Sequence, residues 1–143
     1  MRALRNREVA VVVSEEIQGW YRDGQVTITT GAASRMSHWE LQGLIAHERG
    51  HHAHYHDRWL QVAAAVAFGL VGIAPWVVEI EHAIAVSVAT IASFYLFKLL
   101  LEVNADQYAA RATSRWNVWN MLQVIRANRV WSLQLEVRLW IVK

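Results

Sequence analysis

Two histidines four residues apart, with a glutamate between them, are the residues whose types and spacing most directly indicate chemistry. The segment His47-Glu48-Arg49-Gly50-His51 is an HExxH pattern. On a helix, residues four apart lie on the same face about one turn from each other, so both imidazoles can bind one zinc ion. Glu48 is rotated by about 100° and would stand beside the metal, where it can accept a proton from water. The pattern predicts a zinc-dependent hydrolytic site.

A second candidate ligand lies later in the chain. Glu102 directly follows three leucines, and a carboxylate is costly to bury unless it meets a positive charge. As a third ligand it would complete a His₂Glu set for one zinc ion per chain and leave the fourth position open to water. Asp106, one turn further on, can reach back to the free ring nitrogen of a ligand histidine. The alternative is an amphipathic helix that simply begins at Glu102.

Three more histidines follow the motif, at positions 52, 54 and 56. Because His52 and His56 are again four apart, a second metal site is one interpretation. We favour a second interpretation, in which these side chains face solvent or orient the ligand histidines.

The candidate ligands need a helix and a scaffold to hold them. Ser37 and Glu40 have the spacing of a capping box, which predicts that a helix begins there and runs through the HExxH residues. Residues 8–13 and 25–30 are predicted to be strands that form a small sheet, because the first run is β-branched and the second alternates. Residues 31–36 are expected to be a linker.

The C-terminal part carries weaker signals. Residues 114–128 predict a helix. Residues 130–142 alternate between apolar and polar side chains, which favours a strand that pairs with the N-terminal sheet or with another copy of the chain, while a helix remains an alternative. The sequence thus predicts an α+β fold that is mostly helical.

Residues 59–78 and 83–101 form an apolar helical hairpin in this prediction. The first stretch contains no charge, and the second contains only Lys98. Twenty helical residues span roughly 30 Å, which is the thickness of a bilayer core. Pro75 is expected to break the first helix ahead of the polar tip at residues 79–82. A membrane hairpin is favoured over a buried pair of core helices because the chain has little other material to cover both helices.

The charges at the two ends of this hairpin differ. The tip carries Glu79 and Glu81, whereas the positive charges fall on the side of the predicted metal site: Arg49, Arg58, Lys98, Arg111 and Arg115. By the positive-inside rule, the catalytic side would lie in the cytoplasm. A soluble cytoplasmic protein is the alternative.

Composition limits the remaining classes. At 143 residues the chain is expected to be a single domain, residues 1–143, with the hairpin at 59–101 inserted between the two metal-binding motifs. It is 55% hydrophobic and 18% charged, and its net charge of +2 gives no basis for a nucleic-acid partner. It has no cysteine, which excludes thiolate zinc sites. Self-association into a homo-oligomer is left open.

With these motifs in hand, the chain resembles the gluzincin metallopeptidases of the HtpX and CAAX prenyl protease type, including the small minigluzincins. The resemblance is carried by HERGH at residues 47–51 and by EVNADQYAA at residues 102–110. It implies zinc-dependent hydrolysis of a peptide or protein substrate, with His47, His51 and Glu102 as ligands and Glu48 as the base.

The resemblance also implies a substrate strand. In the family an extended peptide pairs with a strand that precedes the metal helix, which here would be formed by Gln25, Val26, Thr27, Ile28 and Thr29. Family members add a His, Tyr or Arg to stabilise the tetrahedral intermediate, but neither Tyr108 nor Arg111 is selected by spacing. The small relatives are often latent, so the tail could block the cleft. Two rival functions are a catalytically silent zinc-binding scaffold and the hydrolysis of a non-peptide amide or ester.

Overall fold

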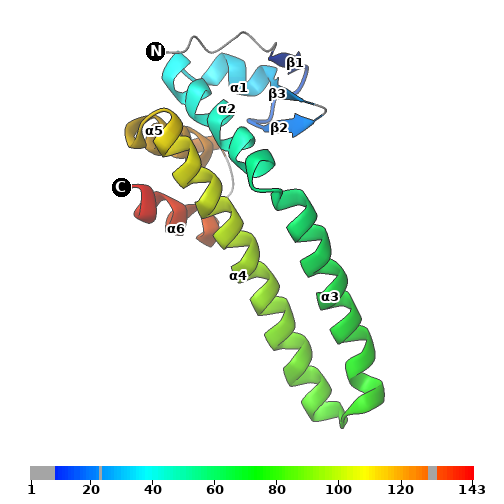
Figure 1. The fold of residues 1–143 in the computed structure, drawn as a ribbon. Coiled ribbons are helices and arrows are strands. Elements are labelled where there is room, and N and C mark those ends of the chain that lie inside the picture. Colours follow the sequence, from blue (N-terminus) through cyan, green and yellow to red (C-terminus); the bar gives the residue numbers. More distant parts are fainter. Residues whose placement is uncertain (1–8, 23, 129–131) are drawn as a thin grey trace.

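The fold is a small mixed head from which two long helices extend side by side (Figure 1). It was obtained as a computed structural model that describes residues 9–22, 24–128 and 132–143. The predicted class, α+β and mostly helical, is confirmed. The described elements, in chain order, are β1 (Ala10–Val12), β2 (Gly19–Arg22), β3 (Gln25–Thr29), α1 (Thr30–Arg35), α2 (His38–Ala53), α3 (His56–Val77), α4 (Ile80–Ala112), α5 (Arg115–Asn128) and α6 (Leu133–Val142).

The N-terminal sheet has three described strands in the order β1-β3-β2. β1 runs parallel to β3, with Ala10 beside Thr27, and β2 runs antiparallel to it, with Arg22 beside Gln25. The two strands expected from the sequence are present, but β2 was not expected. Its sequence, GWYR, is short and does not alternate in polarity. Gly24, at a φ of +85°, occupies the turn between β2 and β3.

The segment expected to be a linker instead forms the short helix α1. The hydroxyl of Thr29 accepts a hydrogen bond from the amide of Ala32, which caps this helix. Gly31 donates its amide to the carbonyl of Ser14 at 2.8 Å, so the helix is also tied to the loop after β1. A Cβ at Gly31 would lie 2.3 Å from a backbone oxygen, and only glycine therefore fits at this crossing.

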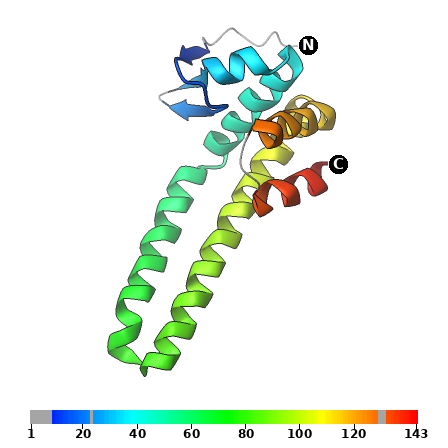
Figure 2. The same cartoon turned by 180° about the vertical axis from the view of Figure 1, so that it is seen from behind.

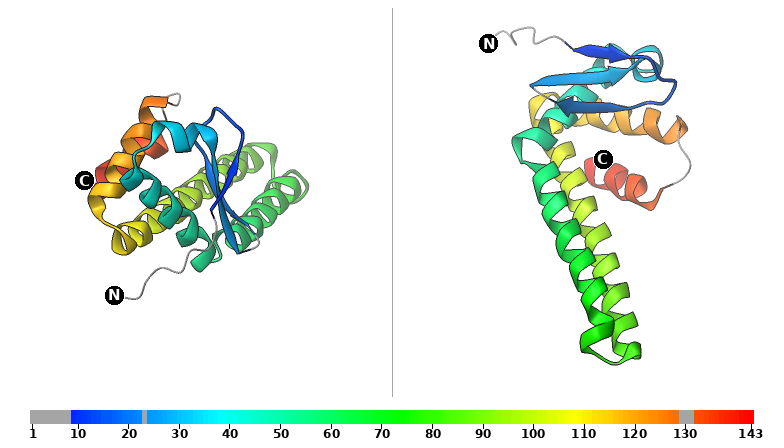
Figure 3. Two further views of the ribbon diagram at one scale, coloured as in Figure 1. Left: turned by 90° about the horizontal axis from the view of Figure 1, so that it is seen from above. Right: turned by 90° about the vertical axis from the view of Figure 1, so that its right-hand side faces the viewer.

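Helix α2 begins as predicted. The amide of Ser37 donates to the Glu40 carboxylate at 2.6 Å, and the amide of Glu40 donates to the Ser37 hydroxyl at 3.5 Å. This capping box is therefore confirmed. Seen from above, the sheet lies on one side of α2 and helices α5 and α6 lie on the other (Figure 3). The helix that carries HExxH is thus the centre of the head.

Helices α3 and α4 form the apolar hairpin, which extends well beyond the head (Figure 2). Each contains an 18-residue stretch apolar enough to cross a membrane, and only 6% and 0% of these stretches, respectively, is buried. Pro75 does not end α3, which continues to Val77, because a proline near the last turn removes only one helical hydrogen bond. Helix α4 is continuous for 33 residues, roughly 50 Å, so the hairpin and the Glu102 region are one element.

The C-terminal segment is a helix, not the strand that alternation favoured. Helix α6 buries Leu135, Leu139 and Val142, which are spaced i, i+4 and i+7. This spacing places them on one helical face against the core, although Leu135 and Leu139 also fit the two-residue period of positions 133–141. Residues 129–131, which include the start of the expected strand, lie outside the described residues. Helix α5 confirms the helix predicted at 114–128.

Candidate metal centre

Helices α2 and α4 cross closely enough to bring their polar residues together. A Cβ on Gly50 would lie 3.1 Å from the Cα of Ala105, so the two backbones meet at this pair. Ala105 is fully buried. Beside this crossing, within one helical turn of it, lie the two motif histidines on α2 and Glu102 on α4. The small residues at the crossing therefore fix how far apart the candidate ligands stand.

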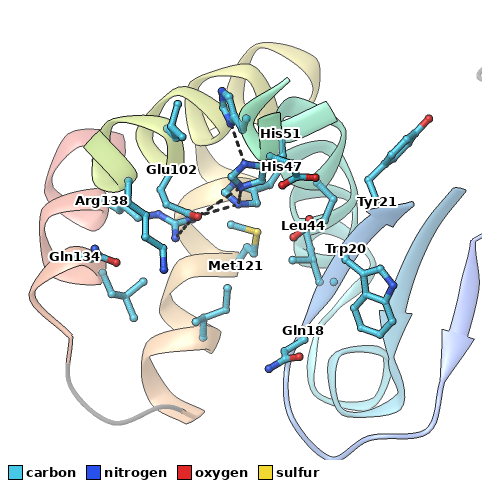
Figure 4. Close-up of a pocket in the computed structure, with 18 of the residues that line it drawn as sticks. Gln18, Trp20, Tyr21, Leu44, His47, His51, Glu102, Met121, Gln134 and Arg138 are labelled. Atoms are coloured by element: carbon cyan, nitrogen blue, oxygen red, sulfur yellow. Dashed lines mark hydrogen bonds and ion pairs between the residues drawn. The ribbon is translucent and has the colours of Figure 1, made fainter. Parts of the chain in front are cut away.

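The three candidate ligands converge on one point (Figure 4). The Nε2 atoms of His47 and His51 are 3.0 Å apart. Oε2 of Glu102 is 3.5 Å from Nε2 of His47, and Oε1 is 3.7 Å from Nε2 of His51. In the part of the chain that the structure describes, this is the group of histidine and acidic side chains that could hold a metal ion.

These distances fit a zinc ion. With zinc–nitrogen and zinc–oxygen bonds of about 2.0–2.2 Å, two ligands of a tetrahedral site stand roughly 3.3 Å apart. The separation of the two nitrogens, 3.0 Å, and the shortest distances from each nitrogen to the Glu102 carboxylate, 3.5 Å to Oε2 and 3.7 Å to Oε1, lie close to this value. Two imidazoles and one carboxylate are also a donor set that zinc accepts in catalytic sites, where a fourth position remains for water or substrate.

The charges around the two histidines attract a cation. Burial by itself lowers the pKa of His47, but the nearby carboxylates of Asp106 and Glu102 outweigh it and raise the pKa to about 9 in the metal-free protein. His51 has less support from carboxylates, and burial lowers its pKa to about 4. Burial also opposes ionisation of Glu102, yet His47 and the charge of Arg138 hold its pKa below the ordinary value. The two carboxylates thus favour a positive charge at His47 and remain ionised themselves.

Asp106 lies where its spacing from Glu102 suggested. It is fully buried, and its Oδ1 atom is 2.8 Å from Nδ1 of His47, although the N–H direction is not well aligned with the oxygen. The carboxylate therefore contacts the ring nitrogen of His47 that does not face the ligand cluster. Such a contact selects the ring orientation and tautomer of a metal ligand.

His56 has the corresponding position beside His51. Its Nδ1 atom is 2.8 Å from Nδ1 of His51, and the residue is buried. His52, in contrast, stacks on Tyr21 with ring centroids 4.2 Å apart and is exposed. Among the described residues, His52 and His56 are therefore not part of a second cluster that could hold a metal, and the prediction that these histidines face solvent or orient a ligand agrees with their positions.

Glu48 stands beside the ligands on the same helix. Burial raises its pKa to about 7, and the positive charge of His47 reduces this effect only in part. Its side chain packs against the start of β2, because a Cβ on Gly19 would lie 3.2 Å from Cγ of Glu48. A carboxylate with a pKa near 7 can both accept and release a proton at neutral pH.

The ligands and Glu48 line a cavity of about 420 Å³ between the sheet, α2, the base of the hairpin and α6. Apolar side chains cover much of its wall: Ile17, Leu44, Leu60, Leu101, Met121, Ile125 and Leu135. Neither Tyr108 nor Arg111 lines it. The C-terminal helix forms one wall of this cavity.

The structure places the expected substrate strand inside the described sheet. β3 lies between β1, which pairs with residues 27–29, and β2, which pairs with residues 25–28, so little of its edge is free for a peptide to add as another strand. Gln25, Val26, Thr27, Ile28 and Thr29 do not line the cavity. The cavity is lined instead by Gln18, Gly19, Trp20 and Tyr21, at β2. β2 lies at the edge of the described sheet.

Arg138 is the site residue that the sequence analysis missed. It comes from α6, and its guanidinium contacts Glu102 and Asp106 of α4 at 2.7–2.8 Å. The available signal was an arginine next to the apolar face formed by Leu135, Leu139 and Val142, which becomes visible only when the segment is treated as a helix.

The comparison with protein families agrees with this geometry. The family model for peptidase family M48 matches residues 7–127, which include both metal-binding motifs. The chain belongs to peptidase family M48. This confirms the resemblance at the level of the M48 metallopeptidases, which depend on zinc, and leaves the HtpX or CAAX subtype as an expectation. No curated protein and no solved structure matches the chain.

Proposed function

We propose that the chain is a zinc-dependent endopeptidase. The observation that carries the proposal is the convergence of His47, His51 and Glu102 on one point, with Glu48 beside them in an open cavity. These three residues would hold the ion. When bound there, zinc supplies a Lewis acid that polarises a peptide carbonyl and makes water more acidic at neutral pH.

The residues of the chain would then perform the proton transfers. Glu48, with its pKa near 7, accepts a proton from the attacking water and returns it to the leaving amine. Asp106 and His56 hold the rings of His47 and His51 in place through the ring nitrogens that face away from the ligand cluster. The apolar wall of the cavity limits access of bulk water to the carboxylates.

We place the substrate on β2 instead of β3. A peptide in extended form would pair with the outer edge of β2, the edge strand that lines the cavity, and main-chain hydrogen bonds would supply much of its affinity. Gly19 packs directly against Glu48, so a peptide bound along this edge would pass beside the base.

The experiment compares the wild-type chain, purified in detergent and loaded with zinc, with the Glu48→Gln variant. We expect the wild type to cleave within long peptides and the variant to lose about 10²–10⁴-fold in rate, because the general base is removed. Zinc content should be unchanged in both. Glu81→Gln, the same substitution at the exposed hairpin tip, is the matched control and should retain full activity.

Other outcomes would favour the rival functions. A wild-type chain that binds zinc but cleaves no peptide in a broad library would be a silent scaffold. Cleavage of esters or non-peptide amides in the same screen, with peptides left intact, would assign the hydrolysis to another substrate class.

We also propose that the hairpin inserts into a bilayer with the head in the cytoplasm. Its apolar side chains are exposed, and Trp59 and Trp76 stand near the two ends of α3, as tryptophans do at membrane interfaces. Glu79 and Glu81 lie where α3 and α4 meet. This tip of the hairpin is far from the head (Figure 1). Protease-protection of tags placed at the tip and at the C-terminus tests the orientation. Equal access to both tags in sealed vesicles would contradict it.

A further inference from the structure

One arginine binds both acids that stand beside the ligand histidines. Nε and Nη2 of Arg138 donate to Oδ2 and Oδ1 of Asp106 at 2.7 and 2.8 Å, which is a two-bond contact. Nη1 lies 2.8 Å from Oε2 of Glu102. Each nitrogen of the guanidinium is thus engaged with a carboxylate. Figure 4 shows Arg138 beside Glu102.

The two acids need this partner because of where they stand on α4. Glu102 and Asp106 are one helical turn apart, and like charges at this spacing repel each other. The Asp106 side chain has no exposed surface, so its charge has no compensation from water. The Arg138 side chain is itself only 13% exposed, which excludes the high screening of a surface ion pair.

The contacts also determine which atoms remain for a metal. Arg138 binds Oε2 of Glu102, which also lies 3.5 Å from Nε2 of His47, while Oε1 faces Nε2 of His51 at 3.7 Å and makes no contact with the guanidinium among those described. Through the two bonds to Asp106, it also fixes the carboxylate that contacts Nδ1 of His47. Only arginine has the planar arrangement of donors that can make these three contacts at once, because lysine offers a single ammonium.

We propose that Arg138 is a positioning residue of the metal centre, so that helix α6 completes a site whose ligands lie on α2 and α4. The inference rests on the proposed metal site but not on turnover. The M48 family match ends at residue 127, before α6, and therefore assigns no role to this arginine. Arg138 acts by fixing the Glu102 carboxylate in one rotamer and by holding Asp106 against His47.

The test measures metal binding in the full chain in detergent. Zinc affinity is determined by competition with a chromogenic chelator, and Co²⁺ replaces zinc to report ligand geometry through its visible absorption. We expect Arg138→Met to weaken zinc binding by about 10–100-fold, as removal of partners of metal ligands does, and to change the Co²⁺ spectrum. Arg138→Lys should recover part of the affinity because it keeps the charge but loses the planar contacts.

Arg126→Met is the matched control. Arg126 makes a 2.8 Å ion pair with Glu136, so it also connects α6 to the head, but its side chain is 50% exposed and contacts no acid of the site. Its loss should leave zinc affinity and the Co²⁺ spectrum unchanged. If Arg138→Met proves less folded than this control by circular dichroism, Arg138→Lys becomes the deciding variant, since it retains the buried charge.

Wild-type zinc affinity and an unchanged Co²⁺ spectrum in the deciding variant would overturn the proposal, even if peptide cleavage is lost. That pattern would instead assign Arg138 to the reacting carbonyl, as a residue that stabilises the intermediate. A wild-type chain that binds zinc but cleaves nothing would contradict the proposed function and leave this test of Arg138 fully valid.

Discussion

The two ends of helix α4 have opposite relations to their surroundings. From Glu102 to its C-terminus the helix lies in the head, where Ala105, Asp106 and Ala109 are fully buried. Towards the tip the same helix is apolar, yet its 18-residue hydrophobic window has no buried residue, and Ala83 is the buried residue of this part of the helix. The head therefore buries charges, and the hairpin exposes apolar side chains. Whether a segment of α4 is buried therefore depends on which other elements pack against it, and its own hydropathy does not decide it.

The two regions accordingly depend on different forces. In the head, Asp106 is stable inside the protein because Arg138 and His47 contact it. In the hairpin, exposed residues such as Phe68 and Trp76 would each be unfavourable in water, and soluble monomers rarely expose apolar patches of more than a few hundred Å². A bilayer would provide the missing apolar contacts, which is the reason for the proposed insertion.

The largest expected effect follows from placing a charge in the middle of the hairpin. Phe68 is 79% exposed and lies near the midpoint of α3. Phe68→Arg should weaken insertion by about 3–4 kcal/mol, since a central arginine is unfavourable by about 2.5–3.5 kcal/mol and a phenylalanine is slightly favourable. The measurement is the fraction of protein that floats with liposomes.

Trp39→Arg is the matched control, because Trp39 is 61% exposed but lies at the start of α2 in the head. It should float like the wild type. If Phe68→Arg floated as much as the wild type, the hairpin would not be what inserts into the membrane. Equal losses of flotation in Phe68→Arg and Trp39→Arg would mean that the head contributes as much to membrane binding as the hairpin does.

Local patterns predicted the parts of the molecule whose structure depends on neighbours in sequence. The capping box at Ser37, the HExxH spacing and the charge-free stretches all act within a few turns of helix. Glu102 was found because a carboxylate after three leucines needs a positive partner, whatever the fold. These inferences required no knowledge of how the elements pack.

Features that depend on contacts between distant segments were harder to predict. Residues 133–142 fit both a strand and a helix by periodicity, and the helix is stabilised by packing on α4 and α5, with Arg138 bound to acids about thirty residues earlier. The position of the predicted substrate strand within the sheet depends on such contacts too. Which strand lies at an edge depends on the strand order β1-β3-β2, and β2 has no alternating pattern of its own to reveal it.

An effect of intermediate size on stability is expected from metal binding. A bound metal should stabilise the head because one of its ligands, Glu102, lies at the end of α4 that is part of the head. Zinc at about 100 times its dissociation constant should raise the free energy of unfolding by about 2.7 kcal/mol. Glu102→Gln should abolish most of this increment because a ligand is weakened. Glu79→Gln, the same substitution before the opposite end of α4, should keep it. Thermal unfolding with and without zinc, followed by tryptophan fluorescence, checks both variants. If zinc stabilised the two variants equally, Glu102 would not be a metal ligand.

The smallest expected effect on stability comes from replacing a helical glycine by alanine, either in the head or in the hairpin. A Cβ at Gly50 would meet the Ala105 backbone at 3.1 Å, whereas a Cβ at Gly69 in α3 would meet nothing within 4 Å. Gly69→Ala should stabilise by up to about 1 kcal/mol, because alanine favours a helix more than glycine does. At Gly50 the same gain is opposed by overpacking of about 1–3 kcal/mol, since the backbone of α4 cannot move aside without displacing Glu102.

We therefore expect Gly50→Ala to destabilise the metal-free chain by about 1 kcal/mol and to weaken zinc binding, with Gly69→Ala as its control. Denaturant unfolding in detergent and the chelator competition measure the two quantities. If Gly50→Ala stabilised the chain as Gly69→Ala does, helices α2 and α4 would have room to spare at their crossing. The spacing of the three ligands would then have to be set elsewhere, and the Arg138 contacts would be the remaining restraint on Glu102.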